Sequence, residues 1–315
     1  MGIMDKLRKS SRAWARTIAV VEPVSRLRNV GMANTHSDFN DDAGKIHKDT
    51  FKIRLAHDDN RTREARFLVE KRYLDKGYQA SGPSGQQVCP ERITLATYKS
   101  EEVIGTITIG FDTGAGLLVD ELYKTEVDGL RQQGLRVCEF TKLAIDNKGA
   151  SKRMIAGLFQ VAYLYAVKIW GYTDIVIEVN PTHVPFYQRM LGFQPLGEER
   201  ICPRVGAPAL LLRLDAAGYG TSMIEKFGGH HELSRQERSL YPYFMSPQEE
   251  QVILARIARG GCHDLRLPGS FFPQYRLGDR TGTSQITQQT HCHRRHGGSW
   301  RISSADPGQT RSRKI

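Results

Sequence analysis

The chain has 315 residues, with 45 lysine and arginine side chains against 34 aspartate and glutamate side chains, and a formal net charge of +11. This length suffices for one large domain or two modest ones with a buried core. No run of about 18 apolar residues occurs, which excludes a membrane-spanning helix. The apolar stretch from Thr17 to Val21 is too short for a signal peptide, so we expect a cytoplasmic protein.

Cysteine and histidine usage gives no sign of a metal centre. The five cysteines are scattered and contain no CxxC pair, which is typical of neither a disulfide framework nor a zinc ribbon. Cys262-His263, His291-Cys292-His293 and His296 match no zinc module in their spacing. We therefore expect no metal site.

The positive charge lies in the two flanks of the chain. Residues 1–50 hold 9 basic and 6 acidic side chains, and residues 262–315 hold 9 basic and 3 acidic ones, whereas the middle is nearly neutral. We expect a partly disordered basic arm at 1–48 and a disordered basic tail at 262–315. Such flanks suit an acidic partner. The tail has almost no interleaved aromatic residues, so no specific nucleic acid is expected, while a peripheral membrane contact through the arm stays open.

From Phe51 onward the hydrophobic pattern predicts an α/β domain with a mixed sheet. Alternating or continuous short apolar runs predict strands, and apolar spacings of three and four with capping residues predict helices. The expected elements are a strand at 51–55, a helix beginning at Asp58 or Asp59, a hairpin of 92–99 and 103–111, a helix at 117–133, a strand at 135–146, a helix at 151–170, a strand at 174–179, a helix at 181–191 and strands at 193–196 and 209–214.

These elements place the α/β domain at 49–217. Residues 218–261 are expected to form a helical appendix that packs on the domain, because the aromatic run 240–244 needs burial. We expect the fragment 50–260 to fold by itself. The apolar face of the first helix is expected to consist of Ala65, Phe67, Leu68 and Tyr73.

The strand around residues 137–146 carries two charges, Glu139 and Lys142, in an otherwise apolar pattern. A buried carboxylate is costly unless it is paired or used. An edge strand with a wet face, a Glu139–Lys142 ion pair and a functional site are all compatible with this pattern. In a regular strand Glu139 and Thr141 share a face and Lys142 points the other way, so both charges reach one site only if a β-bulge intervenes.

The second notable segment is 180–193, which resembles the motif that closes the acyl-group site in the Gcn5-related N-acetyltransferase fold. In that motif an Asn precedes a helix with Phe-Tyr and then Leu-Gly-Phe, as Asn180, Phe186-Tyr187 and 191–193 do here. That fold usually has a glycine-rich loop that cradles the coenzyme A pyrophosphate on backbone N–H groups. Residues 146–153 do not fit this loop, which argues against coenzyme A as the donor.

Two relatives of that fold lack the loop because they take an acyl chain from acyl carrier protein. One is the family of autoinducer (acyl-homoserine lactone) synthases, whose Glu-x-Ser-Arg-Phe strand is similar to residues 139–143. The other is the family of long-chain N-acyl amino acid synthases, which the chain resembles more closely, from about residue 50 to 258. The stretches that carry this resemblance are 138–144, 180–193, 202–205, 207–209 and 239–244.

The resemblance implies a catalytic domain at 49–217 that moves a long-chain acyl group from the acyl-phosphopantetheine of acyl carrier protein to the amino group of an amino acid. The partners are then this carrier and the amino acid, and no cofactor stays bound. Glu139 is the candidate base for the amine, and Tyr187 is placed to protonate the leaving thiolate. Backbone N–H groups near Leu143 to Ile145 are candidates to bind the oxyanion.

The remaining candidates contact the substrates. Lys142 would hold the amino acid's carboxylate or a phosphate of the carrier arm, and His183, four residues from Tyr187, is a candidate proton shuttle. The acyl chain needs an apolar groove, expected where the strands ending at Ile145 and Val179 separate. The predicted substrate-binding residues are Thr141, Lys142, Leu143, Ala144, Ile145, Asn180, His183 and Phe186, and the predicted groove residues are Phe140, Leu158, Phe186 and Met190.

Two alternative functions stay open. An autoinducer synthase would need a sulfonium-bearing substrate, and its N-terminal aromatic and arginine pattern is partly present at Arg66, Phe67 and Tyr73. A non-catalytic sensor or binding module of the same fold would bind partners through its tails, but Glu139 and Tyr187 disfavour this reading.

Overall fold

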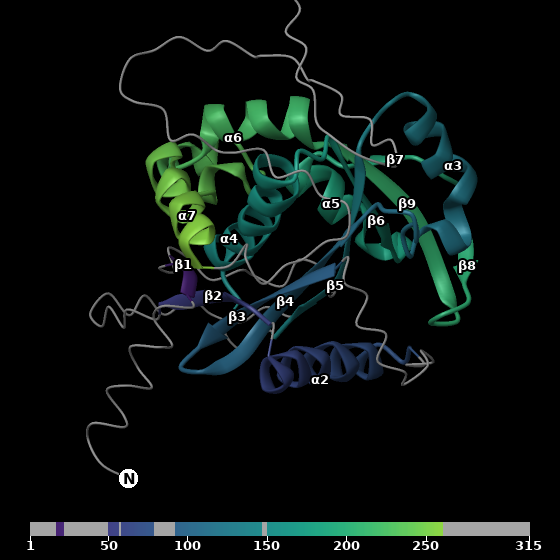
Figure 1. Ribbon diagram of the computed structural model, residues 1–315, viewed down its shortest axis with the longest axis horizontal. Helices are drawn as coiled ribbons and strands as arrows, with labels where there is room; N and C mark the ends of the chain where they lie inside the picture. The colour runs from purple at the N-terminus through teal and green to yellow at the C-terminus, as the bar shows by residue number, and fades with distance from the viewer. Residues whose placement is uncertain (1–16, 22–49, 57, 79–91, 147–149, 261–315) are drawn as a thin grey trace, which may run out of the picture. The chain divides into compact units, whose positions relative to one another are not determined.

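The computed structural model of the protein describes the α/β domain and the helical appendix (Figure 1). Of the predicted arm, only residues 17–21 are among the described residues. The predicted tail, with its cysteines and histidines, lies outside them. The described residues are 17–21, 50–56, 58–78, 92–146 and 150–260.

The domain is built on a nine-stranded sheet in the order β1-β2-β3-β4-β5-β6-β9-β7, with β8 paired to β9. Its β5–β6 pairing is parallel and the other described pairings are antiparallel, which confirms the predicted mixed sheet. The strands are β1 (Thr17–Val21), β2 (Phe51–Leu55), β3 (Arg92–Lys99), β4 (Glu102–Phe111), β5 (Val137–Ile145), β6 (Asp174–Val179), β7 (Gln194–Pro195), β8 (Arg200–Cys202) and β9 (Ala207–Asp215).

Helices cover both faces of the sheet (Figure 1). One face packs against α4 in the main apolar core, and the opposite face packs against α2 and α3. No helix among the described residues is long and apolar enough to cross a membrane. The helical elements are α2 (Asp59–Asp75), α3 (Asp120–Gln132), α4 (Lys152–Tyr163), η1 (Leu164–Ile169), η2 (Pro181–His183), α5 (Val184–Leu191), η3 (Ala216–Gly220), α6 (Thr221–Phe227), η4 (His231–Arg235), η5 (Tyr241–Tyr243) and α7 (Pro247–Gly260).

Strand β1 differs from the expectation that residues 1–48 form an arm outside the fold. It pairs antiparallel with β2 at the edge of the sheet, and its Ile18, Ala19 and Val21 are buried. A five-residue apolar run is long enough for a strand, but its partner lies about thirty residues away and leaves no local sign. The fragment 50–260 therefore lacks one strand of the sheet.

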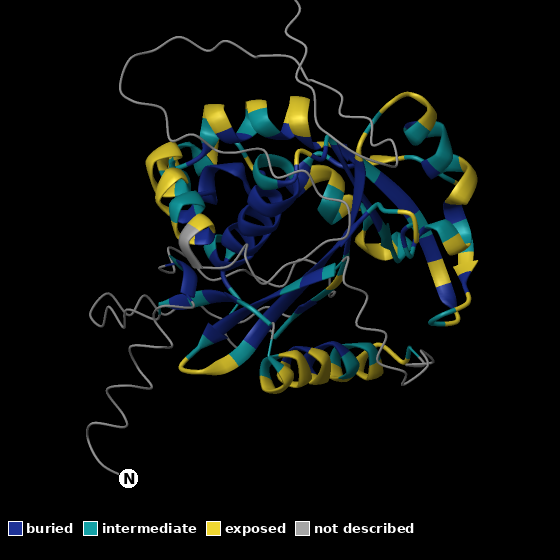
Figure 2. Cartoon of the chain, viewed as in Figure 1, coloured by how far each residue is buried: buried dark blue, intermediate teal, exposed yellow. Residues whose placement is uncertain are grey.

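Helix α2 also corrects an expectation. Ala65 and Leu68 are buried as predicted, and Tyr73 is partly buried, but the Phe67 side chain is 68% exposed. Phe67 and Leu74 are seven residues apart and therefore lie on the same, outward side of the helix, which Figure 2 shows as its exposed side. The apolar residues of α2 thus occupy two sides of the helix, and only one of them meets the sheet.

The helical appendix packs against the domain through buried polar contacts. The Gln160 side chain of α4 is fully buried and donates from Nε2 to the Met245 carbonyl, at 3.2 Å. The Leu240 N–H donates to the Met190 carbonyl at 2.9 Å. Aromatic residues of the run 240–244 join the main core.

Substitution of two helical glycines tests the packing of β1 on α4. A Cβ atom at Gly157 would lie 2.8 Å from Val21 Cγ2, whereas one at Gly129 in α3 would meet nothing within 4 Å. We expect Gly157→Ala to lower the free energy of unfolding by about 1–3 kcal/mol and Gly129→Ala to raise it by about 0.5–1 kcal/mol. Denaturant unfolding measures both changes, and an equal gain in stability from the two substitutions would contradict the β1 packing.

Candidate active site

The parallel pairing of β5 and β6 ends in the middle of both strands. Its register runs from Val137–Asp174 to Glu139–Val176. Beyond that point β5 stays paired with β4 as far as Ile145, and β6 stays paired with β9 as far as Val179. The two strands therefore separate after Glu139, where the sequence predicts the acyl groove.

A β-bulge follows at Lys142 in β5. The register with β4 shifts between Thr106 and Thr108, so that Lys142 and Leu143 both stand opposite Ile107. Lys142 has a left-handed backbone with φ 52°, and its carbonyl accepts a hydrogen bond from Thr106 Oγ1 at 3.0 Å. The β-bulge without which Glu139 and Lys142 could not reach one site is therefore present.

The bulge exchanges the two faces of β5. Before it, Phe140 packs into the core on the α4 face; after it, Leu143 and Ile145 pack against that core. Ala144 instead contacts Leu68 and Val69 of α2 on the opposite face. In a regular strand Ala144 would share a face with Phe140, so the bulge decides which residues face each side of the opening. The Lys142 side chain is exposed.

Glu139 is fully buried, and it is the last residue of β5 that pairs with β6. Its Oε2 accepts a hydrogen bond from the Val119 N–H at 3.1 Å. Its Oε1 lies 3.5 Å from Arg92 Nη2 but accepts no hydrogen bond from the described residues. Gly110 stands opposite in β4, where a Cβ atom would lie 2.6 Å from Oε1. The glycine therefore makes room for the carboxyl group.

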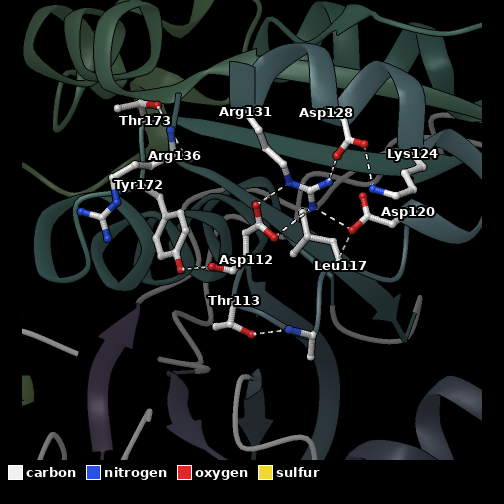
Figure 3. A network of polar contacts seen from close by, with 11 residues as sticks. Asp112, Thr113, Leu117, Asp120, Lys124, Asp128, Arg131, Arg136, Tyr172 and Thr173 are labelled. Carbon is white, nitrogen blue, oxygen red and sulfur yellow. Dashed lines mark hydrogen bonds and ion pairs between the residues drawn. The ribbon is translucent and has the colours of Figure 1, made fainter. Parts of the chain in front are cut away.

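A network around Arg131 fixes the helix end that meets Glu139 (Figure 3). The Arg131 guanidinium binds Asp112 after β4 at 2.7 Å, Asp120 at 2.7 Å and Asp128 at 2.6 Å. Asp120 also accepts a hydrogen bond from the Leu117 N–H at 2.8 Å. The start of α3, which supplies the donor to Glu139, is thereby tied to the end of β4.

Burial raises the pKa of Glu139 above its ordinary value, although Arg92 and the N–H groups of Leu118 and Val119 lower it. The anionic form gains too few hydrogen bonds to offset its lost hydration. A carboxyl group with a raised pKa holds a proton more strongly once it has accepted one, which suits a general base.

Tyr187 lies on α5 with its ring packed edge-on against Phe186 at 5.3 Å, Phe193 at 5.9 Å and Phe159 at 6.5 Å between ring centroids. Burial raises the pKa of the phenol above its ordinary value. A thiol has a pKa of about 8.5, so proton transfer from this phenol to a thiolate is unfavourable. Tyr187 is therefore better suited to donate a hydrogen bond to the thiolate than to protonate it.

Asn180 takes a more structural position than expected, whereas the His183 residue is mostly exposed. Asn180 Oδ1 accepts from the Thr182 N–H at 3.0 Å, which caps η2, and Nδ2 donates to the Pro208 carbonyl at 3.3 Å. His183 ends η2. Partial burial, followed by the charge of Lys76, lowers the pKa of His183, so its imidazole is largely neutral at pH 7.

An ion pair that the sequence did not predict lies near Glu139. Arg204 Nη2 lies 2.7 Å from Glu178 Oε2, and Arg204 also pairs with Glu121 and donates to the Leu118 carbonyl at 3.1 Å. Burial and then Glu178 raise the pKa of Tyr73, while Arg204 lowers it. Tyr73 therefore lies close enough to this ion pair to be affected by both of its charges. The sequence signals this ion pair only through a glutamate inside an apolar strand, Glu178, and through the place of Arg204 in the stretch 202–205 that resembles the N-acyl amino acid synthases.

A small apolar cavity of about 20 Å³, room for about one water molecule, lies in the core on the α4 face of the sheet. Phe140 and Ile175 line it at the sheet. Of the other predicted groove residues, Leu158 and Met190 are buried in the core and Phe186 packs on Tyr187; none of the three lines this cavity.

Comparison with known proteins agrees with this geometry. Residues 64–215 match the family model of the N-acyl amino acid synthase FeeM. The solved structure of FeeM, an N-acyl amino acid synthase from uncultured soil microbes, is 27% identical, with 54% of this chain and 94% of that chain covered and a TM-score of 0.50. No curated protein matches the chain.

Two other solved structures are more distantly similar. Escherichia coli ElaA is 11% identical, with 52% of this chain and 97% of that chain covered and a TM-score of 0.38. The AHL synthase LasI is 12% identical, with coverages of 54% and 95% and a TM-score of 0.40. The family match and the N-acetyltransferase-like fold together support N-acyltransferase activity. Residues 64–215, just under half of the chain, are thus similar to the N-acyl amino acid synthase FeeM family.

Proposed function

We propose that the protein transfers a long-chain acyl group from the phosphopantetheine arm of acyl carrier protein to the amino group of an amino acid. The observation that carries the proposal is the pair of neighbours where β5 leaves β6. Glu139 is a buried carboxyl group on one face, and Phe140 packs into the apolar core on the other. The proposal places proton transfer at Glu139 and the acyl chain along the apolar face where the strands part.

The reaction needs a neutral amine. Free amino acids are mostly ammonium ions at neutral pH, so a base must take a proton before or during attack. In the proposed step Glu139 takes the ammonium proton and releases it to solvent, and the neutral amine nitrogen then bonds to the thioester carbon. Glu139 takes a second proton from this nitrogen as the carbon–sulfur bond breaks, and that proton passes to the departing thiolate, which accepts a hydrogen bond from Tyr187.

The open edge of β5 supplies a donor for the oxyanion. The Asp146 N–H donates to the Ile104 carbonyl of β4 at 2.7 Å. Successive N–H groups of a strand point to alternate sides, so the Ile145 N–H points away from β4 towards the opening. A backbone donor fixed in this way stabilises developing negative charge without reorganising.

The choice of carrier protein over coenzyme A rests on the segment before α4. A pyrophosphate is usually held there by a glycine-rich loop and a helix N-terminus. In this chain Asp146 places a carboxylate at that point, 2.9 Å from Arg72, and Ser151 already caps α4 by accepting from the Met154 N–H at 3.1 Å. Both features disfavour a bound pyrophosphate.

The donor can be identified with purified full-length protein and a mixture of amino acids. Matched long-chain acyl groups are supplied on acyl carrier protein or on coenzyme A, and products are measured by mass spectrometry. We expect N-acyl amino acids to form at least about tenfold faster from the carrier, equivalent to about 1.4 kcal/mol of docking energy. Faster reaction with coenzyme A would refute the donor, and no product from either would refute the function.

Glu139→Gln tests the base. The amide oxygen can still accept from the Val119 N–H, so the fold should survive while the base is lost. We expect the rate at neutral pH to fall about a hundredfold or more. The wild-type rate should rise with pH through a pKa above the ordinary value of glutamate, because the base works only when ionised. A steady-state pH profile of both proteins checks this, and an unchanged rate in the variant would exclude Glu139 as the base.

The same substitution should increase stability. A carboxyl group with a raised folded pKa is destabilising once the unfolded form ionises, and the penalty grows until the pH exceeds the folded pKa. Glu139→Gln is therefore expected to unfold at a higher temperature than the wild type at pH 7, with the difference shrinking below pH 4.5. Gly129→Ala serves as a reference whose effect is independent of pH. A loss of stability at pH 7 would show that the carboxylate is there to hold α3.

The autoinducer alternative gains no support from α2. Arg66 pairs with Glu70 at 2.9 Å on the surface, and Phe67 is exposed, so neither helps to build the candidate site. Tyr73 lies near it, but its neighbours Glu178 and Arg204 do not distinguish the acceptors. The binding-module alternative is addressed by the Glu139→Gln activity.

A further inference from the structure

A single peptide unit joins Glu139 to Arg204. The Val119 N–H donates to Glu139 Oε2 at 3.1 Å, and Arg204 Nη1 donates to the Leu118 carbonyl at 3.1 Å. That N–H and that carbonyl belong to the same peptide bond, the one between Leu118 and Val119. The guanidinium and the carboxyl group therefore bind the two ends of one planar amide, which accepts from the first and donates to the second.

The Arg204 guanidinium is fixed by its turn and by two carboxylates. Arg204 lies between β8 and β9, where the Cys202 carbonyl accepts from the Gly206 N–H at 2.8 Å. Gly206 has a φ of 63°, a conformation that favours glycine. Arg204 Nη2 lies 2.7 Å from Glu178 Oε2, and the guanidinium also pairs with Glu121 of α3. The donor to the peptide unit thus comes from a held side chain.

The peptide unit carries the effect of the Arg204 charge to Glu139. A cation at the carbonyl oxygen makes the N–H of the same amide a better donor, because hydrogen bonds in a chain polarise one another. A stronger donor favours the carboxylate over the neutral acid. Burial, the largest effect, raises the pKa of Glu139, while Arg92, the N–H groups of Val119 and Leu118, and then Arg204 lower it.

Neighbouring charges add to the importance of Arg204. Glu178 lies in β6 two residues beyond Val176, the partner of Glu139, and therefore on the same face of the sheet. Loss of Arg204 would remove a positive charge and leave the Glu178 carboxylate without this partner, and both changes oppose ionisation of Glu139. The titratable and charged groups on the elements around Glu139 are Arg92 of β3, Asp112 after β4, Cys138 of β5, Asp120 and Arg131 of α3, Glu178 of β6 and Arg204.

We propose that Arg204 is a positioning residue for the base: through the Leu118–Val119 peptide it orients the Glu139 carboxyl group and favours its anionic form. The Glu178 ion pair holds Arg204 in this role. The catalytic meaning of the inference rests on the proposed function. Its electrostatic part is a property of the folded protein and is measurable without activity.

Arg200 is the matched control. It lies in β8, donates to the Leu122 carbonyl of α3 and pairs with Glu126, so it makes the same kinds of contact with the same helix one turn further on. The Leu122 carbonyl does not belong to the peptide that binds Glu139. Substitution by methionine keeps a long unbranched side chain and removes the charge and the donors. Arg204→Lys keeps the charge.

The kinetic experiment measures kcat/KM for the amino acid with full-length proteins and saturating acyl carrier protein, from about pH 5.5 to about pH 9. The ratio of variant to wild type cancels the titration of the amino acid itself. We expect Arg204→Met to be at least about threefold slower than the wild type at the low end, with the deficit shrinking as the pH rises. Arg204→Lys should recover most of the low-pH rate, and Arg200→Met should show no pH-dependent deficit. A deficit of the same size at every pH, or the same profile in Arg200→Met, would overturn the inference.

A stability cycle gives a second readout that needs no activity. Glu139→Gln is introduced into the wild type, Arg204→Met and Arg200→Met, and thermal unfolding is measured at about pH 8, where the carboxyl group is ionised or strained to be so. We expect its gain in unfolding temperature to be larger by about 2 °C in Arg204→Met and unchanged in Arg200→Met, because only Arg204 is coupled to the carboxylate.

The outcomes separate the inference from the function. Equal gains from Glu139→Gln in all three backgrounds would overturn the inference, whether or not the protein is active. No N-acyl amino acid from the wild type would refute the proposed function and leave the coupling to be decided by the stability cycle. If Arg204→Met does not fold, Arg204→Gln takes its place, because its amide can still donate to the Leu118 carbonyl but carries no charge.

Discussion

The separation of β5 and β6 after Glu139 and Val176 is the constraint on which the rest of the site depends. While the two strands are paired, their N–H and C=O groups satisfy one another. Once they part, the edge of β5 that faced β6 no longer pairs with that strand, and the sheet opens between the two. The bulge at Lys142 follows directly, and it turns Leu143 and Ile145 to the apolar face beside Phe140.

Glu139 shows how this opening is linked to the rest of the domain. Its carboxyl group lies in the sheet next to a glycine and accepts a hydrogen bond from the N–H of Val119, the residue that precedes α3. Arg131 fixes that helix end through three aspartates. Burial raises the pKa of this carboxyl group, and a buried group with a shifted pKa is a candidate for a functional site.

Much of the fold could be predicted from local pattern. A hairpin with its turn at residues 100–102 was expected; the loop is one residue shorter, because β4 begins at Glu102, and Ser100 and Glu101 both have positive φ, as a two-residue hairpin loop requires. What pattern does not contain is contact between distant segments. Three contacts join residues far apart in sequence: the pairing of β1 with β2, the Glu178–Arg204 ion pair and the hydrogen bond from Tyr241 to the Leu191 carbonyl. The predicted burial of Phe67 was wrong because α2 carries apolar residues on two sides, and the sequence does not show which side meets the sheet.

The most direct test of the account is mass spectrometry of lipids extracted from cells that express the full chain, beside cells that express Glu139→Gln at equal level. The account predicts N-acyl amino acids in the first extract and few or none in the second, and the spectrum would identify the head group and the chain. No such lipid from the unmutated protein, when it is folded and a carrier protein is present, would contradict the central claim.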